Sequence, residues 1–228
     1  MKYLFIFLQL VTAIAYAQVN SVGAMSDMGK NNFWPTVYLD SLANKSDLIG
    51  LGPLGKMQGE ITILDGVPMN AQVQADGSIQ VVQSWKIPAP FFVYVAVPEW
   101  ENIPLNESIN NLVELQSMVE QQALKMGYDL KEPFPFKLKG TANQQVIHVV
   151  RPRFIEVSGY VEGKKSEKYK LSDTPGDWVG FYSQSAQGVY THRDSFIHLH
   201  FVSTDRTQMG HVDQLQFSND MILSFPKK

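Results

Sequence analysis

The chain has 228 residues, 19 basic and 22 acidic side chains, a formal net charge of −3 and no cysteine. Without cysteine it forms no disulfides, so buried apolar surface and bound groups must stabilise the fold. Its basic residues are dispersed and form no stripe, which argues against nucleic-acid binding. The length suits one large domain or two small, closely packed ones.

Residues 1–17 have the features of a secretory signal peptide. Lys2 supplies a basic end, residues 3–14 are almost continuously apolar, and Ala15-Tyr16-Ala17 fits a small-x-small cleavage site. The segment is too short for a comfortable membrane-spanning helix, and no later apolar run approaches about 20 residues. We therefore expect a secreted or periplasmic protein, cleaved near Ala17 and without a membrane anchor.

The glycine-rich stretch 47–66 predicts a strand that ends in an Asp65-Gly66 turn. Glu60, Thr62 and Leu64 share one face of that strand. A glutamate at the start of a strand is most often solvated, so the spacing alone leaves the role of Glu60 open. The glycines do not indicate a phosphate loop, because no Gly-Lys-Ser/Thr follows and the loop enters a strand rather than a helix.

Apolar patterns predict further strands and one strong helix. The helix spans residues 106–127, with Asn106 or Ser108 as its cap and Gly127 at its end, and we expect it to cover one face of a sheet. Residues 162–170 read as a solvated charged loop. Strands are predicted at residues 69–73, 78–85, 91–97, 134–138, 145–150 and 176–182.

Two of the five histidines have simple structural explanations. His148 lies in the apolar run 147–150, where a histidine is usually structural. His192 lies in a loop and is most simply a surface residue. Arg151 and Arg153 flank Pro152 at the end of the His148 strand, where proline stops further strand pairing.

The stretch 196–215 holds the other three histidines at a spacing suited to one metal ion. His198 and His200 are two apart on a predicted strand, so their imidazoles leave the same face. The polar segment 203–210 can turn the chain back and return His211 to them. A His-x-His pair alone is a modest signal, and the third histidine favours a metal site. Three neutral imidazoles suit Zn²⁺ and leave a coordination position open, while the reaction stays undetermined.

Taken together, these stretches resemble the bacterial acetolactate decarboxylase family from residue 25 to about residue 212. The segments Gly50-Leu51-Gly52, Gly59-Glu60 and Leu64-Asp65-Gly66 resemble its Gly-x-Gly…Asp-Gly-Glu…Asp-Gly pattern. Val179-Gly180-Phe181 resembles its Val-Gly-Phe-Trp. The longest and most specific match is His198-Leu199-His200-Phe201, Asp205-Arg206 and Gly210-His211-Val212, which resembles His-Leu-His-Phe…Asp-Arg…Gly-Gly-His-Val.

The resemblance implies a zinc enzyme that removes CO2 from 2-acetolactate to give acetoin, on a scaffold that usually forms a homodimer. By position it implies that His198, His200 and His211 bind Zn²⁺, with Glu60 beside the metal as a base or water orienter. A 2-hydroxy-3-oxo acid suits such a site because its adjacent oxygens can chelate a cation that stabilises the developing negative charge. Protonation of the substrate carbon then needs a positioned donor.

That donor is where the chain departs from the family pattern. The family has an arginine eight residues after the glycine that corresponds to Gly140, and here the same count reaches His148. Arg151 would need a three-residue insertion, which reverses side-chain parity unless a bulge absorbs it. We therefore predict that either His148 or Arg151 handles the substrate carboxylate and the proton.

The predicted fold is α/β of the α+β type, with mixed β-sheets in two closely packed parts. Residues 18–139 would form a sheet with one main covering helix, and residues 140–228 a half-open, barrel-like sheet that carries the metal. The predicted function is acetolactate decarboxylation by a carbon–carbon lyase. Two alternatives stay open: a divergent relative acting on another small 2-oxo or 2-hydroxy acid, and an exported metal-binding module without catalysis.

Overall fold

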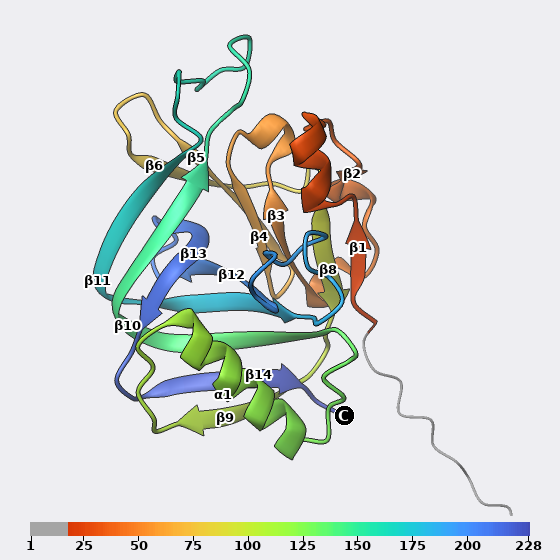
Figure 1. Cartoon of the computed structure of the whole chain (residues 1–228), viewed down its shortest axis with the longest axis vertical. Coiled ribbons are helices and arrows are strands. Elements are labelled where there is room, and N and C mark those ends of the chain that lie inside the picture. The colour runs from red at the N-terminus through yellow and green to blue at the C-terminus, as the bar shows by residue number, and fades with distance from the viewer. Residues whose placement is uncertain (1–17) are drawn as a thin grey trace, which may run out of the picture.

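A computed structural model describes residues 18–228, so the predicted signal peptide lies outside the described residues. Two six-stranded sheets pack together, and the helix α1 lies on the second one (Figure 1). The predicted α+β class is confirmed. In the described part of the chain no helix is long and apolar enough to cross a membrane.

The two sheets use consecutive parts of the chain. The first has the order β1 (Asn20–Val22), β8 (Phe92–Ala96), β3 (Leu48–Pro53), β4 (Glu60–Leu64), β5 (Val67–Val73) and β6 (Ile79–Gln83). The second has the order β11 (Ser166–Tyr182), β12 (Ile197–Ser203), β13 (Met209–Gln216), β10 (Phe134–Val150), β14 (Met221–Pro226) and β9 (Trp100–Leu105). The short strands β2 (Val37–Tyr38) and β7 (Pro88–Ala89) form a separate pair, and 3-10 turns cover Met25–Lys30, Leu39–Ser41, Lys45–Asp47 and Gly55–Met57.

Among residues 18–228 all of these strands pair antiparallel, where the sequence predicted mixed sheets. Antiparallel pairing follows from the many short connections between consecutive strands, since a parallel pair needs a long crossover. The sheets change over between β8 and β9. The expected division between residues 139 and 140 falls inside β10, and α1 belongs with the second sheet.

Four strands of the second sheet close into a ring. The 17-residue strands β10 and β11 pair along almost their whole length. β11 then pairs with β12, β12 with β13, and β13 with β10 again. This ring corresponds to the barrel-like part expected from the sequence. Two strands predicted separately, at 134–138 and 145–150, are one continuous strand, and β11 begins within the stretch 162–170 that was predicted to be a loop.

A bulge in β13 interrupts the ring at one position. Val146 of β10 lies opposite Gln214, but the next residue, Ile147, lies opposite Val212. Asp213 therefore has no partner on β10, which is the signature of one extra residue in a strand.

The predicted turn between β4 and β5 is confirmed. Asp65 and Gly66 both have positive φ angles, 46° and 76°, as a tight two-residue hairpin turn requires. The predicted alternation along β4 is also present. Thr62 and Leu64 face the second sheet, while Ile61 and Ile63 are buried in a separate cluster on the other side.

The helix α1 spans Leu112–Lys125 and starts later than predicted. Its cap is Asn111, whose Oδ1 accepts a hydrogen bond from the backbone N–H of Glu114 at 2.9 Å. The Glu114 carboxylate in turn accepts the backbone N–H of Asn110, the residue before the cap, so these two bonds hold the chain where it enters the helix. Asn106 and Ser108 precede the helix and do not cap it. Gly127, with a φ of +77°, follows its end as predicted.

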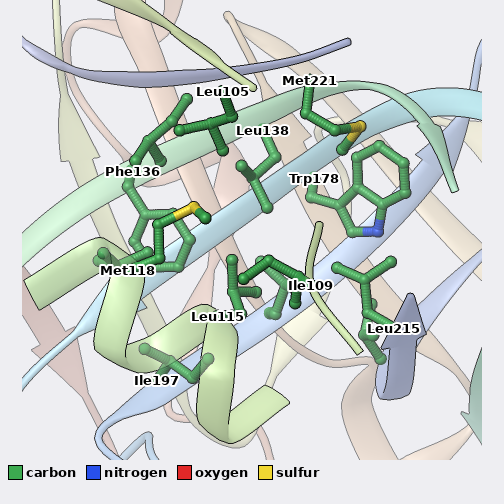
Figure 2. Close-up of a cluster of buried hydrophobic side chains, with 14 of the residues drawn as sticks. Leu105, Ile109, Leu115, Met118, Phe136, Leu138, Trp178, Ile197, Leu215 and Met221 are labelled. Carbon is green, nitrogen blue, oxygen red and sulfur yellow. The ribbon is translucent and has the colours of Figure 1, made fainter. Parts of the chain in front are cut away.

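The buried face of α1 packs on the ring and on β14 to form one core (Figure 2). Trp178 is fully buried in it, and its indole N–H donates to Gln145 at 3.1 Å. A second core lies between the two sheets and joins strands β3 and β8 to the ring. Its fully buried members include Ile49, Leu51, Val93, Val149, Val179 and Phe181.

Candidate metal centre and active site

Three histidines form one row across the ring. His148 on β10 lies opposite His211 on β13, and His211 lies opposite His200 on β12. His198, two residues before His200, shares its face of the strand. Residues 52 positions apart in sequence (148 and 200) thus become near neighbours because the ring places their strands on either side of β13.

His200 has one nitrogen held by the first sheet and one without a partner. Its Nδ1 lies 3.0 Å from the carbonyl oxygen of Ile61 and 3.1 Å from the Thr62 hydroxyl. A carbonyl only accepts, so Nδ1 carries the proton and Nε2 carries the lone pair. This Nε2 is buried and has no hydrogen-bond partner among the described residues. A buried nitrogen lone pair that no hydrogen-bond donor satisfies fits a metal ligand.

His198 and His211 complete a compact set of nitrogen donors with His200. Nε2 of His198 lies 3.0 Å from Nδ1 of His211, and ligand atoms of His198, His200 and His211 all lie within 4.8 Å of one another. All three side chains are buried, with exposed fractions of 3%, 0% and 7%. Burial, and then the proximity of the other histidines, lowers the pKa of each well below its usual value. Three neutral imidazoles converging in this way fit a divalent cation such as Zn²⁺.

Glu60 faces this set from the first sheet. It is only 4% exposed, although a glutamate at a strand start is usually solvated. Its Oε2 lies 3.8 Å from Nε2 of His200, and its Oε1 accepts the backbone N–H of Val150 at 3.3 Å. Burial raises the pKa of Glu60 to about 7, against the opposing charges of His148 and Arg153. A carboxyl with this pKa can both hold and release a proton near neutral pH.

His148 lies between Glu60 and a charged pair at the rim. Its Nε2 is 3.9 Å from Oε1 of Glu60, and its Nδ1 is 2.7 Å from the carboxylate of Asp213. The same carboxylate pairs with Lys168 at 2.9 Å. Burial lowers the pKa of His148, but the Asp213 hydrogen bond and the charge of Glu60 outweigh it, so the net shift is upward. Asp213 thus holds Nδ1 of His148, and Nε2 faces Glu60 on the metal side.

The structure places Arg151 away from this cluster. Its guanidinium donates to the Glu167 carboxylate at 3.2 Å and to the Gly159 carbonyl at 3.2 Å. Arg153 donates to the carbonyl of Lys165 at 2.6 Å, and its charge lowers the pKa of Glu60. Of the two predicted alternatives for the family arginine, only His148 contacts the cluster.

The fifth histidine joins the cluster as well. His192, in the loop before β12, has its Nε2 3.3 Å from Nε2 of His211. His192 is exposed as predicted, but its Nε2 contacts His211, one of the predicted metal ligands. Sequence periodicity gave no signal for it, because it lies in a loop. All five histidines of the chain therefore gather at one place.

A cavity of about 310 Å³ adjoins the cluster between α1 and the strands β12 and β13. His192, His211 and Asp213 line its polar side, and Leu112 and Leu199 are among its apolar lining. This volume is sufficient for a small organic acid.

Comparison with known proteins identifies the family. The family description "Alpha-acetolactate decarboxylase" matches residues 19–225, nearly the whole described chain. The chain belongs to the alpha-acetolactate decarboxylase family. This confirms the resemblance found in the sequence motifs.

The curated members of the alpha-acetolactate decarboxylase family that match are distant relatives. The enzyme of Streptococcus thermophilus is 26% identical over 216 residues, which cover 92% of this chain and 83% of that protein. The enzyme of Brevibacillus brevis is 26% identical over 188 residues, covering 79% of this chain and 60% of that protein.

Solved structures support the family fold. The crystal structure of alpha-acetolactate decarboxylase from Bacillus subtilis strain 168 has a TM-score of 0.71 at 19% identity, covering 93% of this chain and 86% of that one. A Staphylococcus aureus protein of unknown function, described as similar to alpha-acetolactate decarboxylase, has a TM-score of 0.68 at 15% identity, covering 90% of this chain and 84% of that one. At such identities the likeness concerns the fold alone.

Proposed function

We propose that this protein is a zinc-dependent acetolactate decarboxylase, which converts 2-acetolactate to acetoin and CO2. The observation that carries the proposal is the buried set of His198, His200 and His211 with Glu60 facing it, in a chain of this family. The three neutral imidazoles would hold the metal. When bound, Zn²⁺ supplies a Lewis acid that stabilises negative charge developing on substrate oxygens.

The reaction needs two things from the protein's own side chains. When the bond between the carboxylate and C2 breaks, CO2 leaves and the electron pair moves through C2 to the neighbouring ketone, giving an enediolate. The same C2 must then take up one proton to give acetoin. A positive charge must first orient the carboxylate, and an acid must later deliver the proton.

His148 suits both tasks in this chain. Asp213 holds its Nδ1, so its Nε2 faces Glu60 and the metal side. When protonated, its imidazolium can attract the substrate carboxylate, and the proton on Nε2 is placed to be given up. Glu60, with a pKa of about 7, can exchange a proton with the substrate hydroxyl or with His148. We assign proton delivery to His148 rather than Arg151, since the guanidinium of Arg151 is engaged by Glu167.

The test is to load the purified protein with zinc and measure acetoin formation from racemic 2-acetolactate. Glu60→Gln is the matched control, because the amide keeps the shape but cannot exchange the proton. We expect acetoin well above the spontaneous rate for the wild type only. A wild-type rate equal to that in buffer would refute the proposed reaction. The comparisons favour neither another small 2-oxo or 2-hydroxy acid nor a non-catalytic metal-binding role, and a panel of such acids extends the same assay.

We also propose export and self-association, which rest on the sequence. The basic end and apolar run of residues 1–17 support cleavage near Ala17. Amino-terminal sequencing of protein from the culture medium or periplasm tests this, and a retained residue 1 would contradict it. The homodimer implied by the family resemblance is tested by analytical ultracentrifugation of the same material.

A further inference from the structure

His192 touches a proposed metal ligand through one defined pair of atoms. Its Nε2 lies 3.3 Å from Nε2 of His211, with the ring centroids 5.0 Å apart and the planes at 66°. Two ring nitrogens that share a hydrogen bond at this distance must be one donor and one acceptor. The tautomer of one ring therefore fixes that of the other.

The far side of His211 decides which nitrogen carries the proton. Its Nδ1 lies 3.0 Å from Nε2 of His198. Two imidazoles on one tetrahedral Zn²⁺ have nitrogens about 3.3 Å apart, given a metal–nitrogen distance of about 2.0 Å. A cation shared by His198 and His211 thus uses the Nδ1 lone pair. The proton of His211 is then on Nε2, the nitrogen that faces His192.

If His192 bound the same metal ion directly, His211 would have to face that ion with Nε2 instead of Nδ1. The two Nε2 atoms of His192 and His211 are also a ligand-like distance apart. However, the two nitrogens of an imidazole point in divergent directions, so His211 cannot turn both to one ion. Because His198 meets the Nδ1 side, the Nε2 side is left for a hydrogen bond.

We propose that His192 is a positioning residue of the metal centre: its Nε2 accepts the Nε2–H of His211 and so holds Nδ1 of His211 toward the cation. This inference rests on the proposed metal-dependent function. Metal-binding histidines commonly donate their second N–H to a carboxylate, a carbonyl or water, and here an imidazole takes that place.

The loop that carries His192 is fixed on both sides. Before it, the side chain of Gln187 donates to the carbonyl of Arg193 at 2.9 Å and closes the loop on itself. After it, the backbone N–H of Phe196 donates to Gln116 on α1 at 2.9 Å. These contacts fix the backbone on either side of His192, which lowers the ordering cost of presenting its imidazole.

The experiment compares zinc affinity in His192→Ala, His192→Gln and Arg193→Ala by competition with a chelator. We expect about a 10- to 100-fold loss of affinity for His192→Ala. His192→Gln should recover part of it, because the amide oxygen can accept the same proton. Arg193→Ala changes an exposed neighbour in the same loop and should leave the affinity unchanged.

A second measurement reads the tautomer directly. Long-range ¹H–¹⁵N spectra of the zinc-loaded wild type should show His211 protonated at Nε2 and His192 protonated at Nδ1. Unchanged affinity in His192→Ala, or His211 bound through Nε2, would overturn the inference. Zinc binding without acetoin formation would refute the proposed reaction and still leave the affinity comparison decisive. A wild type that binds no zinc would overturn both.

Discussion

The two sides of the candidate site are built by different means. The ligand side, which we define as the proposed metal ligands His198, His200 and His211, is buried and neutral. The proton side, which we define as Glu60, His148 and Asp213, is ionisable, and it is connected to the exposed Lys168. Burial and strand register fix the first side, whereas side-chain ion pairs fix the second.

This difference bears on how each side tolerates change. A buried imidazole fixed by a backbone carbonyl has one usable tautomer and one direction, so a substitution there removes the function outright. When one member of an ion pair near the rim is replaced, neighbouring charged side chains can partly take over its role. The ligand side should therefore behave as all-or-none, and the proton side as graded. Four predictions test this contrast. Three concern metal content and activity, in order of decreasing effect, and the last concerns stability.

The largest effect is expected for His200→Ala. It removes the proposed ligand whose Nδ1 is held by the Ile61 carbonyl, and two imidazoles of the proposed set remain. We expect loss of stoichiometric zinc and of acetoin formation, beyond the 10- to 100-fold typical of an outer partner. Metal analysis after dialysis measures this, with Arg193→Ala as the surface control. Retention of one zinc per chain would contradict an all-or-none ligand side.

Glu60→Gln should retain zinc and lose activity. The amide oxygen can still accept the N–H of Val150, but the group no longer exchanges a proton. We expect acetoin formation to fall by about 100- to 10,000-fold at unchanged metal content. If Glu60→Gln lost zinc instead, Glu60 would be a metal ligand, and the division into a ligand side and a proton side would be wrong.

His148→Asn should lower activity by about 100-fold. The asparagine amide keeps a donor to Asp213 and removes the ring nitrogen that faces Glu60. The comparison variant is Arg151→Ala, which breaks an ion pair with Glu167. We expect it to keep its turnover and to lower the melting temperature by about 2–4 °C, for a cost of about 1 kcal/mol. The reverse pattern would assign proton delivery to Arg151.

The last prediction concerns the stability of the metal-free protein. The folded-state pKa of Glu60 is raised from 4.5 to about 7, so the folded state binds this proton more tightly than the unfolded state. The resulting stability is complete below pH 4.5 and is lost as the pH rises to about 7, by about 3 kcal/mol. Because the histidines titrate in the same range, the measured quantity is the difference between wild type and Glu60→Gln in urea unfolding. A difference that does not change with pH would contradict the shifted pKa.

Much of the ligand side follows from the sequence. His198 and His200 are on one face because strand side chains alternate, and the polar segment after them returns His211. The Asp65-Gly66 turn and the alternation along β4 were readable for the same reason. These features depend on residues close together in the chain, where local rules apply.

The proton side depended on contacts that no local rule supplies. The position of His148 opposite His211 requires the ring to close between β10 and β13. The engagement of Arg151 by Glu167 follows from the pairing of β10 with β11. The late start of α1 has a similar cause, since Ile109 bridges to Phe217 and keeps residues before Asn111 extended.

The bulge at Asp213 lets the strand β13 contribute side chains both to the core under α1 and to the histidine cluster. His211 and Leu215 are four residues apart and would face the same way in a regular strand. Instead Leu215 is buried beneath α1, whereas His211 faces the other histidines. The extra residue reverses the alternation of side chains between them. One register of β13 therefore buries Leu215 under α1 and also turns His211 toward the other histidines. If β13 were shifted by one residue, either Leu215 would leave the core under α1 or His211 would turn away from the other histidines. Correct packing under the helix and correct assembly of the site therefore depend on the same strand register.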